Sequence, residues 1–152
     1  MTGETNKSKR IILNTILILA AIILVIIIAL AIKGLGTEKK KENDRENDGE
    51  YARKIAVACH AALANEDAYA AAMDIIDSPA GQLVLYLDAS GLTGAPKEFE
   101  TEFSNNFERD NKFHVPEYRL NGAEVFIIKI RDNSMTVWSG KKDGTTLELL
   151  YQ

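Results

Sequence analysis

One short acidic stretch of the sequence has the residue types and spacing of a calcium-binding loop. Asp44, Glu46 and Asp48 would take positions 1, 3 and 5 of such a loop, and Gly49 would take position 6. Position 12 should supply a bidentate glutamate, but this position is Ile55, and no helix is predicted before the stretch. We therefore interpret these acids as solvated charge rather than as a calcium site.

The candidate nucleophiles of the sequence lack partners that would activate them. Cys59 and His60 are adjacent, and adjacent side chains on a helix point about 100° apart, so they do not form a nucleophile–base pair. We expect Cys59 to be a small buried apolar residue and His60 to lie on the surface. Four serines also have no recognisable base: Ser90, Ser104, Ser134 and Ser139. We assign no catalytic, cofactor-binding or metal-ligating residue, and the sequence predicts a protein that is not an enzyme.

Composition excludes further classes of function. The 152 residues contain one cysteine and two histidines. An internal disulfide and a multi-cysteine zinc site each need at least two cysteines, so both are excluded. The formal net charge is −4, and residues 51–152 carry 10 basic and 15 acidic side chains. An acidic domain is a poor partner for nucleic acid, because phosphate contacts need a basic surface.

A long apolar segment over residues 11–32 predicts a membrane anchor. Sixteen of its 22 residues are Ile, Leu or Val, and no charge interrupts it. Twenty-two helical residues span about 33 Å, which matches a bilayer core of about 30 Å. A cleaved signal peptide is the alternative, but its apolar region is only about 7–15 residues long. We predict a retained single-pass transmembrane helix that follows a short basic tail, residues 1–10, and contacts the lipid bilayer.

The orientation of this anchor rests on two opposing arguments. The flank before the segment has Lys7, Lys9 and Arg10, whereas five basic residues follow it, so a simple count slightly favours a cytoplasmic C-terminal side. A basic tail before a first apolar segment is nevertheless typical of a signal anchor, and long following domains are exported largely regardless of their charge. We expect the C-terminal part to be extracytoplasmic.

Residues 33–49 form a charged juxtamembrane linker with no apolar period, and residues 50–152 are predicted to form one α+β head domain. An alanine-rich helical segment is expected over residues 50–77. It forms either one kinked helix or two helices, in which case Asn65 caps the N-terminus of the second helix. A second amphipathic helix should begin at Pro96. Its Phe99, Phe103 and Phe107 recur on one face, which predicts core packing rather than a ligand shelf.

The last third of the sequence predicts an antiparallel sheet of three or four strands. Residues 125–130 are apolar on one face and nearly so on the other, and residues 135–138 and 145–151 continue a meander through two turn signals. Leu147, Leu149 and Tyr151 should share one side of the last strand. His114–Arg119 is a candidate edge strand because Pro116 is tolerated there. Residues 82–87 predict a short strand or a helical turn, followed by a loop rich in Gly and Ala.

In its order of elements the chain resembles type IV pilins and pseudopilins, above all the pilin-like proteins of Gram-positive anaerobes. Ala61–Tyr69 is similar to the end of their long helix, Pro96–Phe107 to their second helix, and Ala123–Tyr151 to their C-terminal strands. The prepilin cleavage motif is absent, since Lys9 and Arg10 run directly into the apolar segment, and no glutamate lies in residues 11–32.

The resemblance implies a structural or accessory protein of a pilus or secretion assembly, with a pilin-like head on a generic anchor. Gly34, Gly36 and the charged run to Gly49 should break the single continuous helix that the family has. A function of another class remains open, namely a membrane-anchored module that senses or binds a small ligand or protein. A pre-formed apolar pocket would favour this module, and an exposed apolar face on residues 50–77 would favour assembly.

Overall fold

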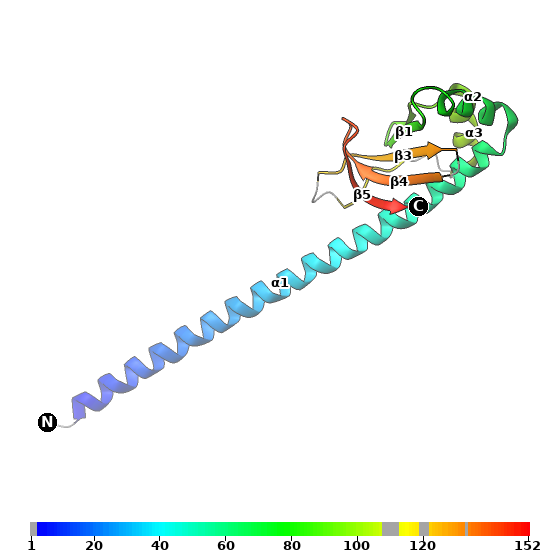
Figure 1. Cartoon of the computed structure of the whole chain (residues 1–152). Helices are drawn as coiled ribbons and strands as arrows, with labels where there is room; N and C mark the ends of the chain where they lie inside the picture. Colours follow the sequence, from blue (N-terminus) through cyan, green and yellow to red (C-terminus); the bar gives the residue numbers. More distant parts are fainter. Residues whose placement is uncertain (1–2, 108–112, 119–121, 133) are drawn as a thin grey trace. The chain divides into compact units, whose positions relative to one another are not determined.

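The computed structural model describes residues 3–107, 113–118, 122–132 and 134–152, and leaves the side chains of residues 3–18 and 35 aside. The chain divides into two compact units, Met1–Glu42 and Asn43–Gln152, which we call the N-terminal unit and the C-terminal unit. Figure 1 follows the order of helices and strands along the chain.

The first helix, α1, runs without interruption over Gly3–Leu63, a length of 61 residues. The break that we expected at Gly34, Gly36 and the charged run to Gly49 is therefore wrong. Each glycine costs a helix only about 1 kcal/mol, and Lys, Glu and Arg between them are strong helix formers. Opposite charges also recur at helical spacing, such as Lys40 with Asp44, which supports a helix in water.

The alanine-rich segment forms two helices, as in the second of the two alternatives. After α1 ends, Asn65 adopts an extended backbone and its side-chain oxygen accepts hydrogen bonds from the backbone N–H groups of Asp67 (3.0 Å) and Ala68 (3.1 Å). This cap satisfies two N–H groups that have no partner inside the helix. Helix α2 then covers Glu66–Ile76.

The sheet has five antiparallel strands in the order β2-β1-β3-β4-β5, so the predicted α+β class is confirmed and the predicted strand number was too low. The strands are β1 (Leu83–Asp88), β2 (Gly91–Thr93), β3 (Val125–Arg131), β4 (Ser134–Gly140) and β5 (Thr146–Tyr151). Strand β2 lies in the segment predicted as a loop, because Gly91 with φ of 125° lets the chain turn back onto β1. The candidate strand at His114–Arg119 is wrong over residues 113–118, which form no strand; Arg119 lies outside the described residues.

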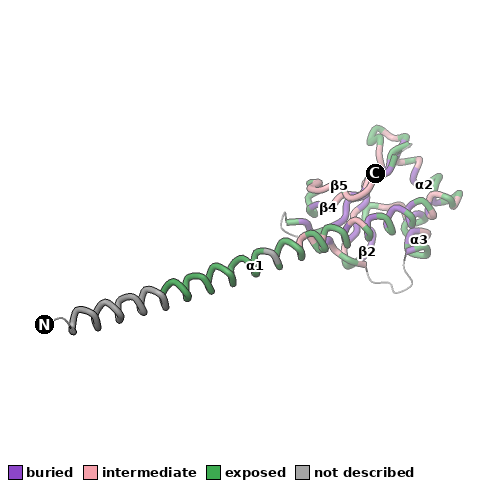
Figure 2. The backbone as a smooth tube through the Cα atoms, turned by 90° about the horizontal axis from the view of Figure 1, so that it is seen from below, coloured by how far each residue is buried: buried purple, intermediate pink, exposed green. Residues whose placement is uncertain are grey.

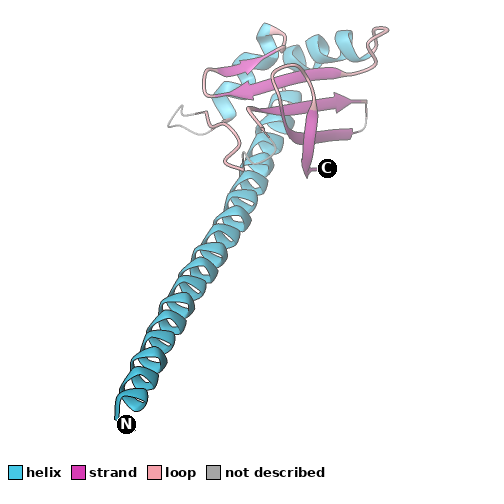
Figure 3. Ribbon diagram, turned by 90° about the vertical axis from the view of Figure 1, so that its left-hand side faces the viewer, coloured by secondary structure: helices cyan, strands magenta, loops and turns pink. Residues whose placement is uncertain are grey.

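The core of the C-terminal unit lies between one face of the sheet and the helices (Figure 3). Helix α3 (Lys97–Asn106) places Phe103 in this core with none of its surface exposed, and Phe99 and Phe107 are buried beside it. The interpretation of the phenylalanine stripe as core is confirmed. Alternate residues of β1 and β3 and a stripe of α1 complete this core, which Figure 2 shows as buried backbone.

The other face of the sheet has a smaller buried patch around Ile127. A Cβ atom on Gly140 would lie 2.7 Å from the backbone oxygen of Thr145 and would also meet the Ile127 side chain, so only glycine fits at this end of β4. The pairing of β4 with β5 is irregular: Tyr151 pairs with Val137, and Leu149 pairs with the adjacent Trp138. Leu149 and Tyr151 therefore face opposite sides, and Leu149 is 42% exposed. The expected shared side for Leu147, Leu149 and Tyr151 was wrong for this reason.

The burial of the phenylalanine stripe yields a stability prediction. Phe103→Ala should lower the free energy of unfolding by about 3–5 kcal/mol, because a ring in a filled core leaves a cavity. Val57→Ala is the matched control: Val57 is 68% exposed on α1, and its truncation should cost less than about 0.5 kcal/mol. Denaturant titration followed by Trp138 fluorescence measures both changes. Equal midpoints for the two variants would contradict the core assignment.

Candidate functional site

An exposed apolar surface on α1 is the most prominent feature of the N-terminal unit. Val25 and Ile32 are 66% and 65% exposed, and the large apolar side chains between Leu19 and Leu30 are exposed to a similar degree. Within the described residues this helix is the one that is long and apolar enough to cross a membrane. A water-soluble helix buries such a surface, so this part of α1 is compatible with a single-pass membrane anchor.

A buried carboxylate is the central polar group of the C-terminal unit. Asp48 lies on α1 and is 2% exposed. Its Oδ1 accepts a hydrogen bond from the backbone N–H of Glu117 (2.7 Å), and its Oδ2 accepts one from the N–H of Tyr118 (3.0 Å). Both N–H groups belong to residues 113–118, which we call the strap. The strap has no strand partner within the described residues, so the helix side chain satisfies its backbone.

Neighbouring residues of α1 hold the same strap. The Tyr51 hydroxyl oxygen accepts a hydrogen bond from the backbone N–H of His114 (2.9 Å), and Asn47 donates its amide N–H to Glu117 Oε2 (2.9 Å). The Arg45 guanidinium lies over the Tyr118 ring at 4.4 Å and pairs with Glu148 of β5 at 3.4 Å. About two turns of α1 therefore join the strap and β5 to the helix.

The electrostatics of this site follow from burial. Removal from water disfavours the charged carboxylate and raises the pKa of Asp48, while the two backbone hydrogen bonds oppose this rise. The two effects differ in sign because the N–H groups stabilise the ionised form, whereas desolvation penalises it. The group is thus a structural acceptor that fastens the strap, and its oxygens already have partners.

The interpretation of Asp44, Glu46 and Asp48 as solvated charge is wrong for Asp48, which is buried. Residues 44–49 are helical, so Asp44 and Asp48 share one face while Glu46 points away from it, and Asp48 turns inward to the strap. No group of three or more His, Cys, Asp or Glu side chains in the described part of the chain could hold a metal ion. Cys59 is buried and His60 is exposed, as expected, and desolvation raises the pKa of the Cys59 thiol to about 12, which makes it unreactive.

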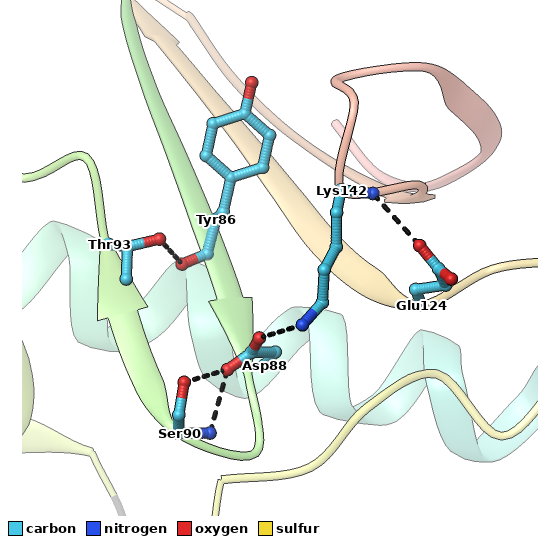
Figure 4. Close-up of polar contacts among 6 residues, drawn as sticks. All are labelled: Tyr86, Asp88, Ser90, Thr93, Glu124 and Lys142. Atoms are coloured by element: carbon cyan, nitrogen blue, oxygen red, sulfur yellow. Dashed lines mark hydrogen bonds and ion pairs between the residues drawn. The ribbon is translucent and has the colours of Figure 1, made fainter.

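A second polar cluster joins β1 to the turn between β4 and β5 (Figure 4). Asp88 accepts hydrogen bonds from the Ser90 hydroxyl and from the Ser90 N–H (2.8 Å), and its Oδ2 lies 3.2 Å from Lys142 Nζ. The Ser90 hydroxyl bond, followed by the other contacts, lowers the pKa of Asp88. A carboxylate with a lowered pKa is a weak proton acceptor, so this arrangement does not activate Ser90 as a nucleophile.

Two of the grooves on the described part of the C-terminal unit bear on function. One has a volume of about 180 Å³ and is lined by the strap, by Phe126 and by the α1 residues around Asp48. The other has a volume of about 330 Å³, and an apolar floor of Val57 and Phe107 lies beside Arg53. The second groove has the size that sequence analysis associated with a binding module, and Arg53, Lys54 and Asn106 line it beside the two apolar residues. In residues 50–77 the exposed large apolar side chains are Val57 and Tyr69, which do not form the apolar face associated with assembly.

Comparison with known proteins found no matching family model, no similar curated protein and no similar solved structure. The contacts made by Asp48 and Tyr51 were not found by sequence reasoning. Their signal was weak but present: Asp48 and Tyr51 lie four residues before Ala52 and Ile55, so they extend the buried stripe toward the N-terminus by one turn.

The hydrogen bonds of the strap yield a second prediction. Asp48→Asn should lower the free energy of unfolding by about 1–3 kcal/mol, because the amide NH₂ faces a buried N–H that needs an acceptor. Tyr51→Phe, which retains the ring, should cost about 0.5–1.5 kcal/mol. Thr93→Val removes an exposed hydrogen bond to Tyr86 and serves as the control with a change near zero.

The pH dependence of these variants tests the same site. A raised pKa means that the folded state binds the proton of Asp48 more tightly than the unfolded state. Its contribution to stability is therefore fully present below the unfolded pKa of about 4 and is lost as pH rises through the folded value. Because the lowered pKa values of Asp88 and Asp143 add a pH dependence of their own, the readout is the difference in stability between the wild type and Asp48→Asn. This difference, measured by denaturant titration, should fall as pH rises across that range. A difference that stays constant with pH would contradict the assignment to Asp48.

The position of Asp48 also predicts where an independently folding fragment begins. Residues 43–152 should be more stable than residues 50–152 by about 2–4 kcal/mol, because the shorter fragment lacks Asp48 and Arg45. Residues 39–152, which add only residues of the N-terminal unit, should match residues 43–152. Equal stability of the 43–152 and 50–152 fragments would show that the strap does not depend on Asp48.

Proposed function

We propose that the chain is a non-enzymatic, membrane-anchored, pilin-like protein with a structural or accessory role in a pilus or secretion assembly. In this proposal residues 11–32 form a retained transmembrane helix and act as a signal anchor. The C-terminal unit is then extracytoplasmic. Protein partners in that assembly would contact the C-terminal unit, and the lipid bilayer would surround the apolar part of α1.

One observation carries this proposal: α1 is a single helix of 61 residues that has two different environments along its length. Its apolar residues in the N-terminal unit are exposed, whereas its last turns belong to the core of an antiparallel α+β unit. The resemblance to pilins implied one continuous helix, and the expected interruption at residues 34–49 was a departure from the family beside the absent cleavage motif. That departure does not occur in the helix.

The 330 Å³ groove supports a second candidate function, a membrane-anchored module that binds a small ligand or a protein. Its apolar floor is formed by Val57 and Phe107, and Arg53 supplies a charge at its edge. Drug-sized ligands occupy pockets of about 300–1,000 Å³ with this kind of lining. The two functions share the anchor and differ in what the C-terminal unit contacts.

Protease treatment of intact cells tests the compartment on which the proposal depends. An extracytoplasmic C-terminal unit should be digested by added protease without permeabilisation, while a cytoplasmic marker protein stays intact. The full-length protein should also remain in the membrane fraction after a high-salt wash, because the apolar helix and not charge holds it there. Digestion only after permeabilisation would place the C-terminal unit in the cytoplasm and overturn the proposed assembly role.

A further inference from the structure

The two units of the chain carry opposite net charge. Residues 1–42 contain seven basic and three acidic side chains, whereas residues 43–152 contain eleven basic and nineteen acidic side chains. Four of the basic residues follow the apolar segment directly, namely Lys33, Lys39, Lys40 and Lys41. We call these four the lysine collar. An acidic protein that concentrates lysines next to its apolar helix places its positive charge where a membrane surface would be.

The unbroken helix fixes the depth of the collar. Because α1 continues through Lys41, each residue adds about 1.5 Å along the helix axis. Measured along this axis, Lys33 lies about 2 Å beyond Ile32, and Lys39–Lys41 lie about 10–14 Å beyond it. The headgroup layer extends about 5–7 Å beyond the hydrocarbon core on each side. Lysine stems several bonds long can turn back toward that layer while their ammonium groups stay in water.

The lysines of the collar are accessible, and their segment carries a net positive charge. Lys33, Lys39 and Lys40 are exposed and Lys41 is half-buried. No ion pair involves these lysines in the part of the chain that the structure describes. Glu38 and Glu42 are the acids of the same segment, which leaves residues 33–42 with a net charge of two positive units. These two glutamates weaken the attraction to an anion without cancelling it.

We propose that the lysine collar binds the phosphate-bearing headgroups of anionic phospholipids. This inference rests on the proposed membrane anchor and adds a preference among lipids to it. Each lysine near an anionic surface strengthens binding by up to about fivefold. At about 0.1 M salt this attraction is largely screened at distances beyond about 10 Å. Continuity with the apolar segment favours a lipid over a soluble anion, since the same helix presents both surfaces to one bilayer.

Electron spin resonance of the full-length protein in lipid vesicles tests the proposal. Spin-labelled phosphatidylglycerol and phosphatidylcholine report the fraction of lipid that the protein immobilises. The wild-type protein should prefer phosphatidylglycerol by about threefold to fivefold, and about 1 M NaCl should abolish this preference, because the Debye length falls to about 3 Å. The variant K39Q/K40Q/K41Q should lose most of it, and glutamine keeps the helix because its helix propensity is close to that of lysine.

Two further variants isolate the collar. K97Q/K141Q/K142Q makes the same change of net charge in the C-terminal unit and should keep the wild-type preference. E38Q/E42Q removes the competing acids and should increase the preference for phosphatidylglycerol. Equal immobilisation of both lipids by the wild-type protein, or an unchanged preference in K39Q/K40Q/K41Q, would overturn the proposal.

The same measurement separates this inference from the anchor itself. If the protein immobilises neither lipid, the proposed membrane anchor fails. If it immobilises both lipids equally, the anchor stands and only the headgroup preference fails. Inorganic phosphate at constant ionic strength should not compete. Competition by inorganic phosphate would show that the collar recognises a soluble anion, which would also overturn the proposal.

Discussion

The C-terminal unit depends on the burial of one stripe of α1 in the common core. Ala52, Ala56 and Ala62 of this stripe are almost completely buried, and Cys59 lies among them. Because these side chains are small, the larger residues of the core, such as Phe103 and Phe126, fill the space from the other elements. The alanine content of this segment therefore serves packing as well as helix propensity.

Polar contacts with the strap lie at the start of this stripe. The strap has no strand to pair with in the described part of the chain, and buried backbone N–H groups need acceptors. Helix α1 supplies them from Asp48 and Tyr51. The two N–H groups that donate to Asp48 offset part of the cost of desolvating its carboxylate, and its pKa stays raised because the rest of that cost remains.

Residue patterns were sufficient to predict the elements whose signals are local. The cap at Asn65, the helix after Pro96, the phenylalanine stripe and the meander of β3, β4 and β5 follow from spacing and turn chemistry. The strap was missed because its contacts join residues far apart in the sequence. Strand β2 pairs with the neighbouring β1 and was missed because Gly91–Thr93 is too short to show an alternating pattern. The helix across Gly34 and Gly36 was missed for another reason: each glycine was read as a break, although the favourable residues around it outweigh a cost of about 1 kcal/mol.

The candidate site shows why fold prediction and function prediction diverge for this chain. The two polar clusters that the structure assembles are already satisfied: Asp48 holds the strap and Asp88 holds a turn, so neither carboxylate is poised for proton transfer. What the described residues leave without a partner is surface, namely the apolar length of α1 and the groove beside Val57. Exposed apolar surfaces of this size commonly mark contact with lipid or with another protein. The two surfaces differ in this respect, because the apolar length of α1 is long enough to cross a membrane and the groove beside Val57 is not part of that length.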